Sequence, residues 1–407
     1  MTRLLILGAG GVGSAAARTI ERWGLFERVV VADYSADRAA RAIGGFPERF
    51  RSLAIDATDE SSIVELIEDE HLTAVLNAVD PRFVMPIFQA SLRSGITYLD
   101  MAMSLSKPDP TDPYHRPGVM LGDEQFALAA EWEDKGTLAL CGMGVEPGLS
   151  DVFARYASDE LFASIDEIGV RDGANLTVSG YDFAPTFSIW TTIEECLNPP
   201  VIWDRERGWY TTAPFSQPEV FDFPGGIGPL ECVNVEHEEV ILIPRIINVG
   251  RVTFKYGLGE EFIDVLKALH KLGLDSTAPI RVGGAEVAPR DVVAAVLPDP
   301  AALGEKMTGV TCAGTWVRGT GKDGLPRSVY LYHLVENAWS MREFGSQAVV
   351  WQTAVNPIVA LELLESGAWS GVGVLGPEAF PPKPFLDRLV ERRAPWAFDE
   401  RATIASN

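Results

Sequence analysis

The feature that most constrains the fold of this chain is a run of glycines directly after its first apolar stretch. The motif GAGGVG at Gly8–Gly13 follows a predicted strand at Leu4–Leu7 and opens a helical pattern. In such a motif Gly8 permits a tight turn, Gly10 lets the main chain approach a pyrophosphate, and Gly13 lets the helix lie close to the strand. We therefore predict a dinucleotide-binding turn rather than a plain glycine turn. The expected cofactor contacts are Gly8, Gly10, Gly11, Val12 and Gly13.

A carboxylate at the end of the second predicted strand bears on the choice of coenzyme. The apolar run Val29–Ala32 is followed by Asp33, at the distance of about 20 residues where a carboxylate accepts hydrogen bonds from an adenosine ribose. The same charge would repel a 2′-phosphate. Asp33 therefore favours NAD over NADP. NADP is left open because Arg38 lies nearby and could turn toward a phosphate.

Short apolar runs alternate with helical patterns over about the first 145 residues. This alternation predicts βαβ units stacked into a parallel sheet. The expected strands are Leu4–Leu7, Val29–Ala32, Ser52–Ile55, Ala74–Ala78, Thr97–Leu99 and Thr137–Cys141, with helices over ranges such as Ser61–Glu68 and Phe83–Ser94. The predicted fold class is α/β, with a Rossmann doubly wound parallel sheet in a first domain over residues 1–145.

The pattern changes after Gly148. A helix is predicted over Leu149–Leu161, and runs of β-branched and aromatic residues separated by Pro and Gly follow it. The expected strands are Leu176–Ser179, Glu231–Ile243 and Arg251–Tyr256, with a turn at Pro224–Pro229. These runs predict an α+β second domain over residues 146–350 with a mainly antiparallel sheet.

A third segment, residues 351–407, begins with a helical pattern over Trp351–Gly367. Four prolines come after it, at Pro377, Pro381, Pro382 and Pro384. Because proline does not fit a helix interior, we expect an irregular strap here. We expect the tail after Pro395 to be peripheral.

Charge and cysteine content exclude several classes of partner. The chain carries 34 Lys and Arg against 57 Asp and Glu, a net charge of −23, which would repel nucleic-acid phosphates and anionic lipids. Its four cysteines and five histidines show none of the spacings typical of zinc ligands, so we expect no metal, no disulfide framework and a reducing compartment. No apolar run approaches the roughly 20 residues of a membrane span. We therefore expect a cytoplasmic protein with a small-molecule partner and no nucleic-acid or membrane partner.

The residues that follow the predicted strands are the first candidates for chemistry, because the crevice of such a sheet lies beyond the carboxyl ends of its strands. Asp80 is explained by turn chemistry before Pro81. Asp100 closes the fifth strand and is a candidate for catalysis or substrate contact, against a structural role. The turn Gly142–Gly148 closes the sixth strand. Its free N–H groups could hold an anion or simply cap a helix, and Glu146 within it is a candidate substrate contact.

A histidine among acids stands in the range Val233–Glu239, which is predicted to be a strand. Alternation would put Glu236 and Glu238 on one face of the strand and His237 on the other. The acids could bind an amine, and a histidine of near-neutral pKa could move the proton that leaves the amine before hydride departs. A solvated strand edge with a structural histidine is the alternative. Candidate carboxylate clamps are Arg171, Arg245 and Arg251, each of which could instead be a surface arginine.

Five short motifs together point to a family. They are GAGGVG at Gly8–Gly13, IDATD at Ile55–Asp59, YLD at Tyr98–Asp100, GVEPGLSD at Gly144–Asp151 and HEE at His237–Glu239. With them the chain resembles the saccharopine dehydrogenase family over nearly its whole length. The resemblance implies an NAD(P)-dependent oxidoreductase acting on a C–N bond of an amino acid or secondary amine. It also implies that Asp56 lies by the adenine, that Asn77 lies by the nicotinamide ribose, that the helix from Trp351 packs on the first domain, and that a homodimer forms through the second domain.

The substrate is left open by one departure from the family pattern. Saccharopine and lysine enzymes carry a GGLP-like strand end where this chain has Val170–Asn175, so their substrate contacts cannot be transferred. The HEE motif is closer to the carboxynorspermidine dehydrogenase type. We therefore predict hydride transfer between the nicotinamide and a saccharopine- or lysine-like substrate. The alternative is a polyamine enzyme resembling carboxynorspermidine dehydrogenase or homospermidine synthase.

The roles expected within this reaction follow from the candidates above. His237 is the first candidate for proton transfer and Asp100 the second, while Glu236 and Glu238 would hold the ammonium group. A hypothesis of another class is a redox-sensing protein that binds the dinucleotide without turnover. A third is a synthase that keeps NAD as a tightly held prosthetic group.

Overall fold

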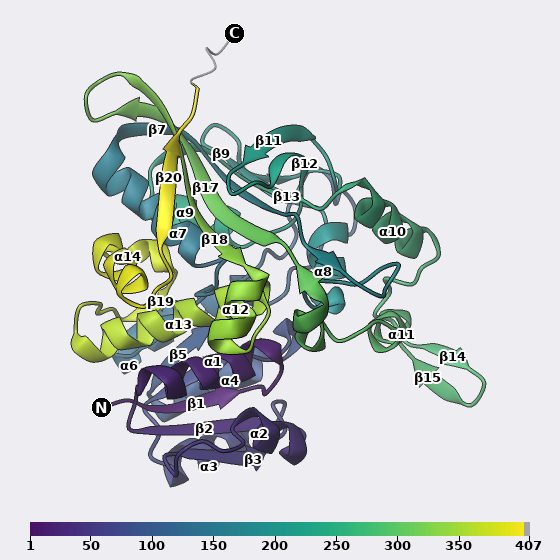
Figure 1. Ribbon diagram of the computed structural model, residues 1–407, viewed down its shortest axis with the longest axis vertical. Helices are drawn as coiled ribbons and strands as arrows, with labels where there is room; N and C mark the ends of the chain where they lie inside the picture. The colour runs from purple at the N-terminus through teal and green to yellow at the C-terminus, as the bar shows by residue number, and fades with distance from the viewer. Residues whose placement is uncertain (403–407) are drawn as a thin grey trace.

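The first domain contains a seven-stranded parallel sheet with helices packed against it (Figure 1). The structure is a computed structural model and describes residues 1–402. The strands from the first part of the chain are β1 (Arg3–Leu7), β2 (Arg28–Asp33), β3 (Phe50–Ala54), β4 (Ala74–Asn77), β5 (Thr97–Asp100) and β6 (Leu138–Leu140). All the strands predicted here are confirmed. The seventh strand, β19 (Gly373–Leu375), comes from the far end of the chain and pairs in parallel with β6, giving the order β19-β6-β5-β4-β1-β2-β3.

The helices of this domain follow from apolar and small residues on one face. In α1 (Gly11–Trp23) the buried residues include Ala15, Ala16 and Ala17, whose small side chains let the helix lie close to the sheet. Gly24 ends α1 in a left-handed conformation. The other helices are α2 (Ala36–Ala42), α3 (Glu60–Asp69), α4 (Val84–Ser94), α5 (Asp123–Phe126) and α6 (Ala129–Lys135), with a 3-10 turn η1 at Pro81–Phe83. The predicted helices at Ser61–Glu68 and Phe83–Ser94 correspond to α3 and α4.

The second domain contains a nine-stranded sheet that is mainly antiparallel. Its strands are β7 (Phe162–Ala174), β9 (Val201–Asp204), β10 (Gly208–Thr211), β11 (Glu219–Phe223), β12 (Gly228–Asn234), β13 (Val249–Gly257), β17 (Val310–Gly321), β18 (Pro326–Glu336) and β20 (Trp396–Glu400). Only β7 and β13 pair in parallel among them. The predicted turn at Pro224–Pro229 joins β11 to β12. The predicted fold class, a Rossmann sheet plus an α+β domain, is therefore confirmed.

Helices and short elements connect these strands. The helices are α7 (Leu149–Tyr156, continued by a π-helical turn, η2, over Ala157–Leu161), α8 (Ile189–Leu197), α9 (Glu239–Ile246), α10 (Glu260–Lys271) and α11 (Pro289–Val296). The 3-10 turns are η3 (Pro300–Ala302) and η4 (Gly304–Lys306), and two short strands, β8 (Thr177–Val178) and β16 (Met307–Thr308), pair with each other. A separate hairpin of β14 (Ile280–Val282) and β15 (Ala285–Val287) projects from the body between α10 and α11 (Figure 1).

The strand predicted over Glu231–Ile243, which carries His237, is wrong over most of its length. β12 ends at Asn234, residues 235–237 are extended coil, and α9 begins at Glu239. The chain leaves the sheet here because the main chain of Glu236 bonds to α8 instead, with its N–H donating to the Glu195 carbonyl at 2.9 Å. An acid in the first turn of α9 also favours the helix. Alternating faces therefore do not apply to Glu236, His237 and Glu238.

The end of the chain corrects one further prediction. The helix predicted over Trp351–Gly367 is confirmed as α13 (Ala348–Ser366), which packs against α1. The segment after it is not an irregular strap, because α14 (Pro382–Glu391) follows a 3-10 turn, η5, at Pro377–Ala379. The first turn of a helix tolerates proline, since its N–H groups have no partner within the helix. The tail after Pro395 lies at the periphery, as predicted, where β20 pairs with β18 as a mostly exposed edge strand.

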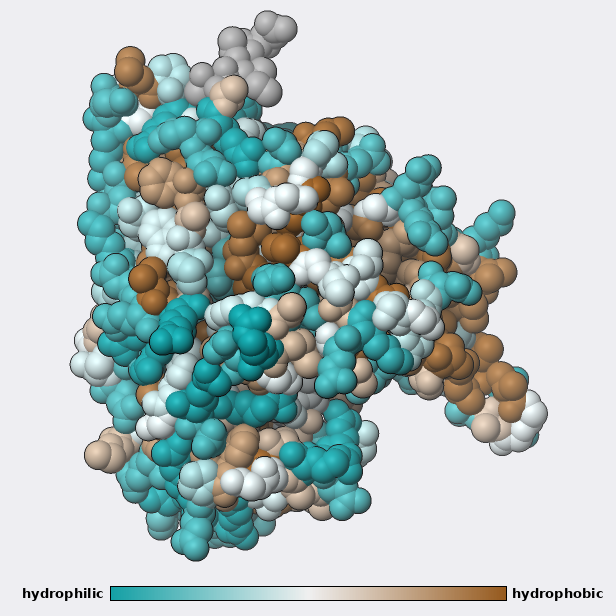
Figure 2. Space-filling model, in the orientation of Figure 1, coloured by the Kyte–Doolittle hydropathy of each residue, from teal (hydrophilic) through white to brown (hydrophobic). Residues whose placement is uncertain are grey.

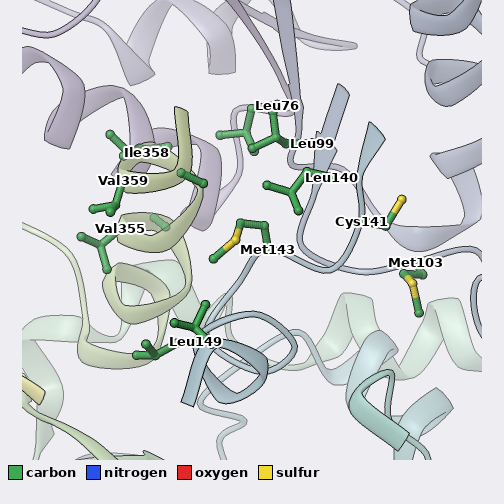
Figure 3. Close-up of a cluster of buried hydrophobic side chains, with 14 of the residues drawn as sticks. Leu76, Leu99, Met103, Leu140, Cys141, Met143, Leu149, Val355, Ile358 and Val359 are labelled. Atoms are coloured by element: carbon green, nitrogen blue, oxygen red, sulfur yellow. The ribbon is translucent and has the colours of Figure 1, made fainter. Parts of the chain in front are cut away.

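Buried side chains join the two domains around α13 and α7. Figure 3 shows Val355, Ile358 and Val359 of α13 beside Met143, with Leu149 of α7 close by. All five side chains are completely buried. This apolar contact fixes the position of the turn after β6 relative to the sheet. No helix within residues 1–402 is long and apolar enough to cross a membrane.

Candidate functional site

The glycine turn between β1 and α1 has the shape that a pyrophosphate requires. Gly8 adopts a φ of 105°, and a Cβ atom there or on Gly13 would collide with the main chain of Ala78 or of Gly8. These two glycines are needed by the fold itself. A Cβ on Gly10 would meet only the Arg38 guanidinium, at 3.4 Å, so the main chain of Gly10 is open on the side of the cavity described below. The residues present therefore fit a dinucleotide on the amino end of α1.

Asp33 and Arg38 lie together beside this turn, where the sequence predicts the adenosine ribose. The Asp33 carboxylate is 5% exposed and accepts hydrogen bonds from the N–H groups of Ala9, at 2.8 Å, and Ser35, at 3.0 Å. The Nε of Arg38 lies 4.0 Å from Asp33. Arg38 also stacks on the exposed ring of Tyr34, with 5.5 Å between its Cζ and the ring centroid. An anionic and a cationic group are therefore both available to the ribose.

The two cofactor contacts implied by the family resemblance have different surroundings. Asn77 lines the cavity and is fixed by hydrogen bonds to the Tyr98 hydroxyl, at 3.0 Å, and the Val79 N–H, at 3.1 Å. Asp56 is exposed and accepts hydrogen bonds from the N–H and hydroxyl of Thr58, which lower the pKa of its carboxyl. Asp56 does not line the cavity. The contact of Asp56 with adenine stays a prediction.

A cavity of about 340 Å³ opens between the glycine turn and the second domain. Its floor is formed by the glycine turn and by the residues after β4 and β5, and its other walls come from the turn after β6, from α8, from η3 and from the start of α13. A cavity of this size is typical of a small-molecule site. The position beyond the carboxyl ends of the parallel strands is where such folds bind ligands.

Carboxylates dominate the ionisable groups of this cavity. Glu146, Glu195 and Glu238 line its inner walls, and within residues 1–402 the only basic side chain lining it is that of Arg38. Burial raises the pKa of all three carboxyl groups, and that of Glu195 reaches about 8 with added repulsion from Glu238. Glu146 Oε1 accepts the Gly314 N–H at 3.0 Å, and repulsion from Asp172 of β7 adds to the raised pKa of Glu146. These raised pKa values favour protonated carboxyl groups, whose protons a bound cation could replace.

Glu236 and Glu238 have the buried positions expected for ammonium ligands, although neither lies on a strand. Glu238 Oε1 accepts the Met103 N–H at 3.1 Å. Glu236 Oε2 accepts the hydroxyl of Ser106 at 2.8 Å and the side-chain amide of Asn198 at 3.0 Å. Glu236 lines a smaller chamber beside the main cavity, and Glu238 lines both.

His237 lies behind the cavity rather than in its wall. Its ring stacks on Phe254 with centroids 3.8 Å apart, and its Nδ1 lies 2.5 Å from Glu239 and 3.4 Å from Glu238. Burial opposes charge on the ring, but Glu239, Glu238 and Glu195 outweigh it and raise the pKa of His237 to about 10. The residue is therefore an imidazolium at neutral pH. His237, Glu238 and Glu239 stand close enough to surround a cation, but the imidazolium already supplies the positive charge there.

Asp100, the second catalytic candidate, lies below the cavity wall. Its carboxylate accepts the Gly142 N–H at 2.6 Å, the side-chain amide of Gln125 at 2.8 Å and the Tyr98 hydroxyl at 2.9 Å. Burial raises the pKa of Asp100 to about 7 despite these bonds. Through Gly142, Asp100 links the end of β5 to the residues that follow β6.

The candidate arginine clamps lie outside the cavity. Arg171 is buried and bonds to Glu219 at 2.6 Å. Arg245 stacks on Phe126, with 3.8 Å between its Cζ and the ring centroid, and Arg251 donates to the Tyr210 hydroxyl at 3.0 Å. The structure therefore does not bring these arginines to the cavity.

Glu195 and the segment Asp299–Ala301 line the cavity but were not anticipated from the sequence. Paired acids at Glu194 and Glu195, within the apolar helical stretch Ile189–Leu197, are the signal that could have indicated a buried site. Asp299–Ala301 carries no comparable signal, because only the path of the chain after α11 brings it over the glycine turn.

Comparison with known proteins assigns the family. Residues 4–140 match the family described as "Saccharopine dehydrogenase NADP binding domain", and residues 144–394 match "Saccharopine dehydrogenase C-terminal domain". The chain belongs to the saccharopine dehydrogenase family. The predictions of an NAD(P) cofactor and of an oxidoreductase of this family are thereby confirmed.

Curated members of the saccharopine dehydrogenase family resemble the chain over nearly its whole length. A carboxynorspermidine synthase from Vibrio alginolyticus is 29% identical over 98% of this chain and 97% of its own. A carboxyaminopropylagmatine dehydrogenase from Synechocystis is also 29% identical, over 97% of each chain.

Two solved structures share the fold of this saccharopine dehydrogenase family member. One is the apo saccharopine dehydrogenase (L-Glu forming) from Saccharomyces cerevisiae, with a TM-score of 0.69, 14% identity, and coverage of 99% of this chain and 100% of that one. The other is a homospermidine synthase from Legionella pneumophila in complex with NAD, with a TM-score of 0.67, 16% identity, and coverage of 98% and 91%. At such identities the likeness shows the fold alone.

Proposed function

We propose that this chain catalyses the NAD(P)H-dependent joining of a diamine- or polyamine-like substrate to an aldehyde, and the reverse reaction. The observation that carries the proposal is the set of carboxylates in the cavity beside the glycine turn, at Glu146, Glu195 and Glu238. Carboxylates bind cationic nitrogen, whereas a substrate recognised mainly through carboxylates would need basic clamps. Arg171 and Arg245 lie outside the cavity. The polyamine-like substrate is therefore favoured over a saccharopine- or lysine-like one.

The names of the relatives support the same class of substrate. Carboxynorspermidine synthase and carboxyaminopropylagmatine dehydrogenase both name compounds that join a carboxylate-bearing unit to a polyamine or guanidine unit. In the synthetic direction, one ammonium, one aldehyde and one NAD(P)H give one secondary amine, one water and one NAD(P)⁺. The nicotinamide supplies the hydride when it is bound.

The protein must hold the nitrogen and move a proton. An ammonium group must lose its proton before its lone pair can attack the aldehyde, and a secondary ammonium must lose its proton before the C–N bond is oxidised. Glu195 is our candidate for this step, because its pKa of about 8 lets it gain and lose a proton near neutral pH. Glu238, with the His237 imidazolium behind it, orients the reacting nitrogen. We therefore propose that His237 is a positioning residue. Asp100 is proposed to have a structural role at the ends of β5 and β6.

The experiment that tests this function follows nicotinamide absorbance with purified protein. NADH and NADPH are offered with pairs of a diamine and an amino-acid semialdehyde, and NAD⁺ and NADP⁺ are offered with saccharopine and lysine. We expect turnover with diamine pairs. Glu195→Gln should lower kcat about 10²–10⁴-fold, the usual contribution of a positioned acid–base group, with coenzyme affinity unchanged.

The matched control is Glu206→Gln, since Glu206 is an exposed acid in the turn between β9 and β10. It should leave kcat unchanged. Absence of turnover with every diamine pair would contradict the proposed function. Full activity of Glu195→Gln would remove Glu195 from the proton step.

We further infer that the chain acts as a homodimer in the cytoplasm. The four cysteines are free and buried, as suits a reducing compartment. The hairpin β14–β15 projects into solvent with Ile280 51% and Val282 59% exposed (Figure 2). An isolated two-stranded hairpin is only marginally stable in water. Pairing with the same hairpin of a second copy would cover its apolar side chains.

A further inference from the structure

A small chamber adjoins the main cavity on the side of α8. It has a volume of about 20 Å³ and shares Pro81, Ala102 and Thr191 with the main cavity. Part of its wall is apolar, from Met103, Leu105, Leu121 and Trp190, and the rest includes the acids Glu194, Glu195, Glu236 and Glu238. A volume of this order holds one water-sized group. An ammonium group has that size, whereas a planar guanidinium with three nitrogens does not.

Glu236 lines this chamber and has one carboxylate oxygen, Oε1, without a hydrogen-bond partner among the described residues. The side chain is 3% exposed, and both of its hydrogen bonds, from Ser106 and from Asn198, end on Oε2. Oε1 accepts no hydrogen bond within the part of the chain that the structure describes. Protein atoms do not fully enclose this oxygen, so it is open to a donor that enters the chamber. A cationic donor would form the strongest hydrogen bond with it.

Among the acids of the chamber, Glu236 is one that has no cationic partner within the described residues. Glu194 is paired with Arg290 of α11, and Glu238 lies 3.4 Å from the His237 imidazole. Glu236 has no such cationic partner among the described residues. Burial, reinforced by Glu194 and Glu238, raises the pKa of Glu236 to about 8. The carboxyl of Glu236 therefore favours its protonated form at neutral pH, and a cation entering the chamber would displace this proton.

We propose that the Glu236 chamber binds the distal primary ammonium group of a linear aliphatic diamine, while the other nitrogen reacts in the main cavity. The inference rests on the proposed function and narrows its substrate class. Methylene groups would pass the shared wall at Pro81 and Ala102, and the far ammonium would donate to Glu236 Oε1. A guanidinium-ended substrate is excluded by the size of the chamber. The chain thus acts on an amine-ended rather than a guanidine-ended compound.

Three ligands that share a four-carbon chain test this directly. Butylamine, putrescine and agmatine end in a methyl, an ammonium and a guanidinium group. Their dissociation constants for the intact protein with NADP⁺ are measured by calorimetry, without turnover. We expect putrescine to bind at least about tenfold tighter than butylamine, the effect of one charge-assisted hydrogen bond, and agmatine to bind no tighter than butylamine. The pair 1,3-diaminopropane and propylamine repeats the comparison for a shorter chain.

Variants test whether the chamber causes the preference for the diamine over the monoamine. Glu236→Gln should abolish the preference for the diamine and leave the affinity for the monoamine unchanged. Glu231→Gln is the matched control, because Glu231 is an exposed acid on β12. Leu121→Ala enlarges the chamber and should raise affinity for agmatine at least about tenfold. This variant tests the size limit of the chamber independently, should Glu236→Gln fail to fold. An intact preference in Glu236→Gln, no diamine preference at either chain length, or wild-type preference for agmatine would overturn the proposal.

The outcome can be separated from that of the proposed function. Diamine binding that depends on Glu236, without turnover of any diamine pair, would support the chamber and contradict the reaction. Turnover with equal KM for monoamine and diamine would support the reaction and overturn the chamber.

Discussion

Asp33 shows how a single side chain fixes the fold at the place where the sequence predicts a coenzyme contact. Its carboxylate accepts N–H groups from Ala9 and Ser35, so it fixes the glycine turn before any coenzyme is present. Arg38, 4.0 Å from Asp33, offsets its charge. A carboxylate offset in this way repels a 2′-phosphate less than an isolated one would. The argument from Asp33 alone, which favours NAD, is therefore incomplete without Arg38.

The contribution of Arg38 can be measured by substitution. Arg38→Ala should raise the KM for NADPH about tenfold, since loss of one charge-assisted contact costs about 1.5 kcal/mol or more. The KM for NADH should change less than twofold, because we expect Asp33 rather than Arg38 to accept hydrogen bonds from the ribose hydroxyls. Steady-state kinetics with both coenzymes give the ratio. Equal effects on the two coenzymes would show that Arg38 does not contact the 2′-phosphate.

The hairpin β14–β15 has no strand partners outside itself among the described residues. Its two strands pair only with each other, and nearly all of their residues are exposed. The brown side chains that gather on this projection in Figure 2 are apolar. At its base, the Arg290 of α11 bonds to Glu194 of α8, and the chain then enters the cavity wall at Asp299. An interface formed by this hairpin would therefore also brace the site.

Charge placed on the hairpin tests the homodimer. The double substitution Ile280→Asp and Val282→Asp should raise the dimer dissociation constant at least about a hundredfold, because burial of such a side chain is worth about 1.5–3 kcal/mol. Light scattering coupled to size-exclusion chromatography gives the mass. Val220→Asp, on β11, is the matched control because Val220 is 70% exposed outside the hairpin. An unchanged dimer in the double variant would place the interface elsewhere.

At the scale of the whole molecule, the chain concentrates acids both on its surface and inside. The net charge is −23, and several buried carboxyls have pKa values raised to about 7 or 8, namely those of Asp100, Glu195, Glu236 and Glu378. Burial is the main cause in each of them. The cationic substrate that we propose would reduce this excess, so ligand binding and stability are linked through protons.

Stability should therefore fall as pH rises. These carboxyls have folded-state pKa values above their unfolded values, so the stability that they contribute is complete below about pH 4 and is lost as pH rises through 7 to 8. His237 acts in the same direction, since its contribution is complete below about pH 6.5 and is lost as pH rises toward 10. We expect the Tm of the unliganded protein to drop by a few degrees between pH 6 and pH 9, where about 1 kcal/mol corresponds to roughly 2–4 °C.

Calorimetric scans at high salt give this measurement, because salt screens repulsion between surface charges but acts little on buried groups. Glu236→Gln removes one of the titrating groups and should flatten the curve. A Tm that is constant or rises over this pH range at high salt would contradict the account of the buried acids.

Much of the first domain could be predicted because its signals are local. The glycine turn and the strands before Gly148 are encoded by patterns a few residues long, and the structure has all of them. Glu236, Glu238 and Asn77 were also predicted as site residues, and all three line the cavity or its chamber. The predicted strand around His237 failed because alternating residues were read without the competing hydrogen bond between Glu236 and α8.

The sequence by itself determined the nucleotide fold, the coenzyme class and the family, because a glycine turn between a buried strand and a helix is a local requirement of backbone geometry. Only the tertiary structure decided which acids line the cavity beside the glycine turn, since Glu195, Glu238 and Asp299 come from separate elements that meet there. It also decided that His237 is an imidazolium held behind the site. Burial and neighbouring charges set that state, and both depend on contacts between residues far apart in the chain.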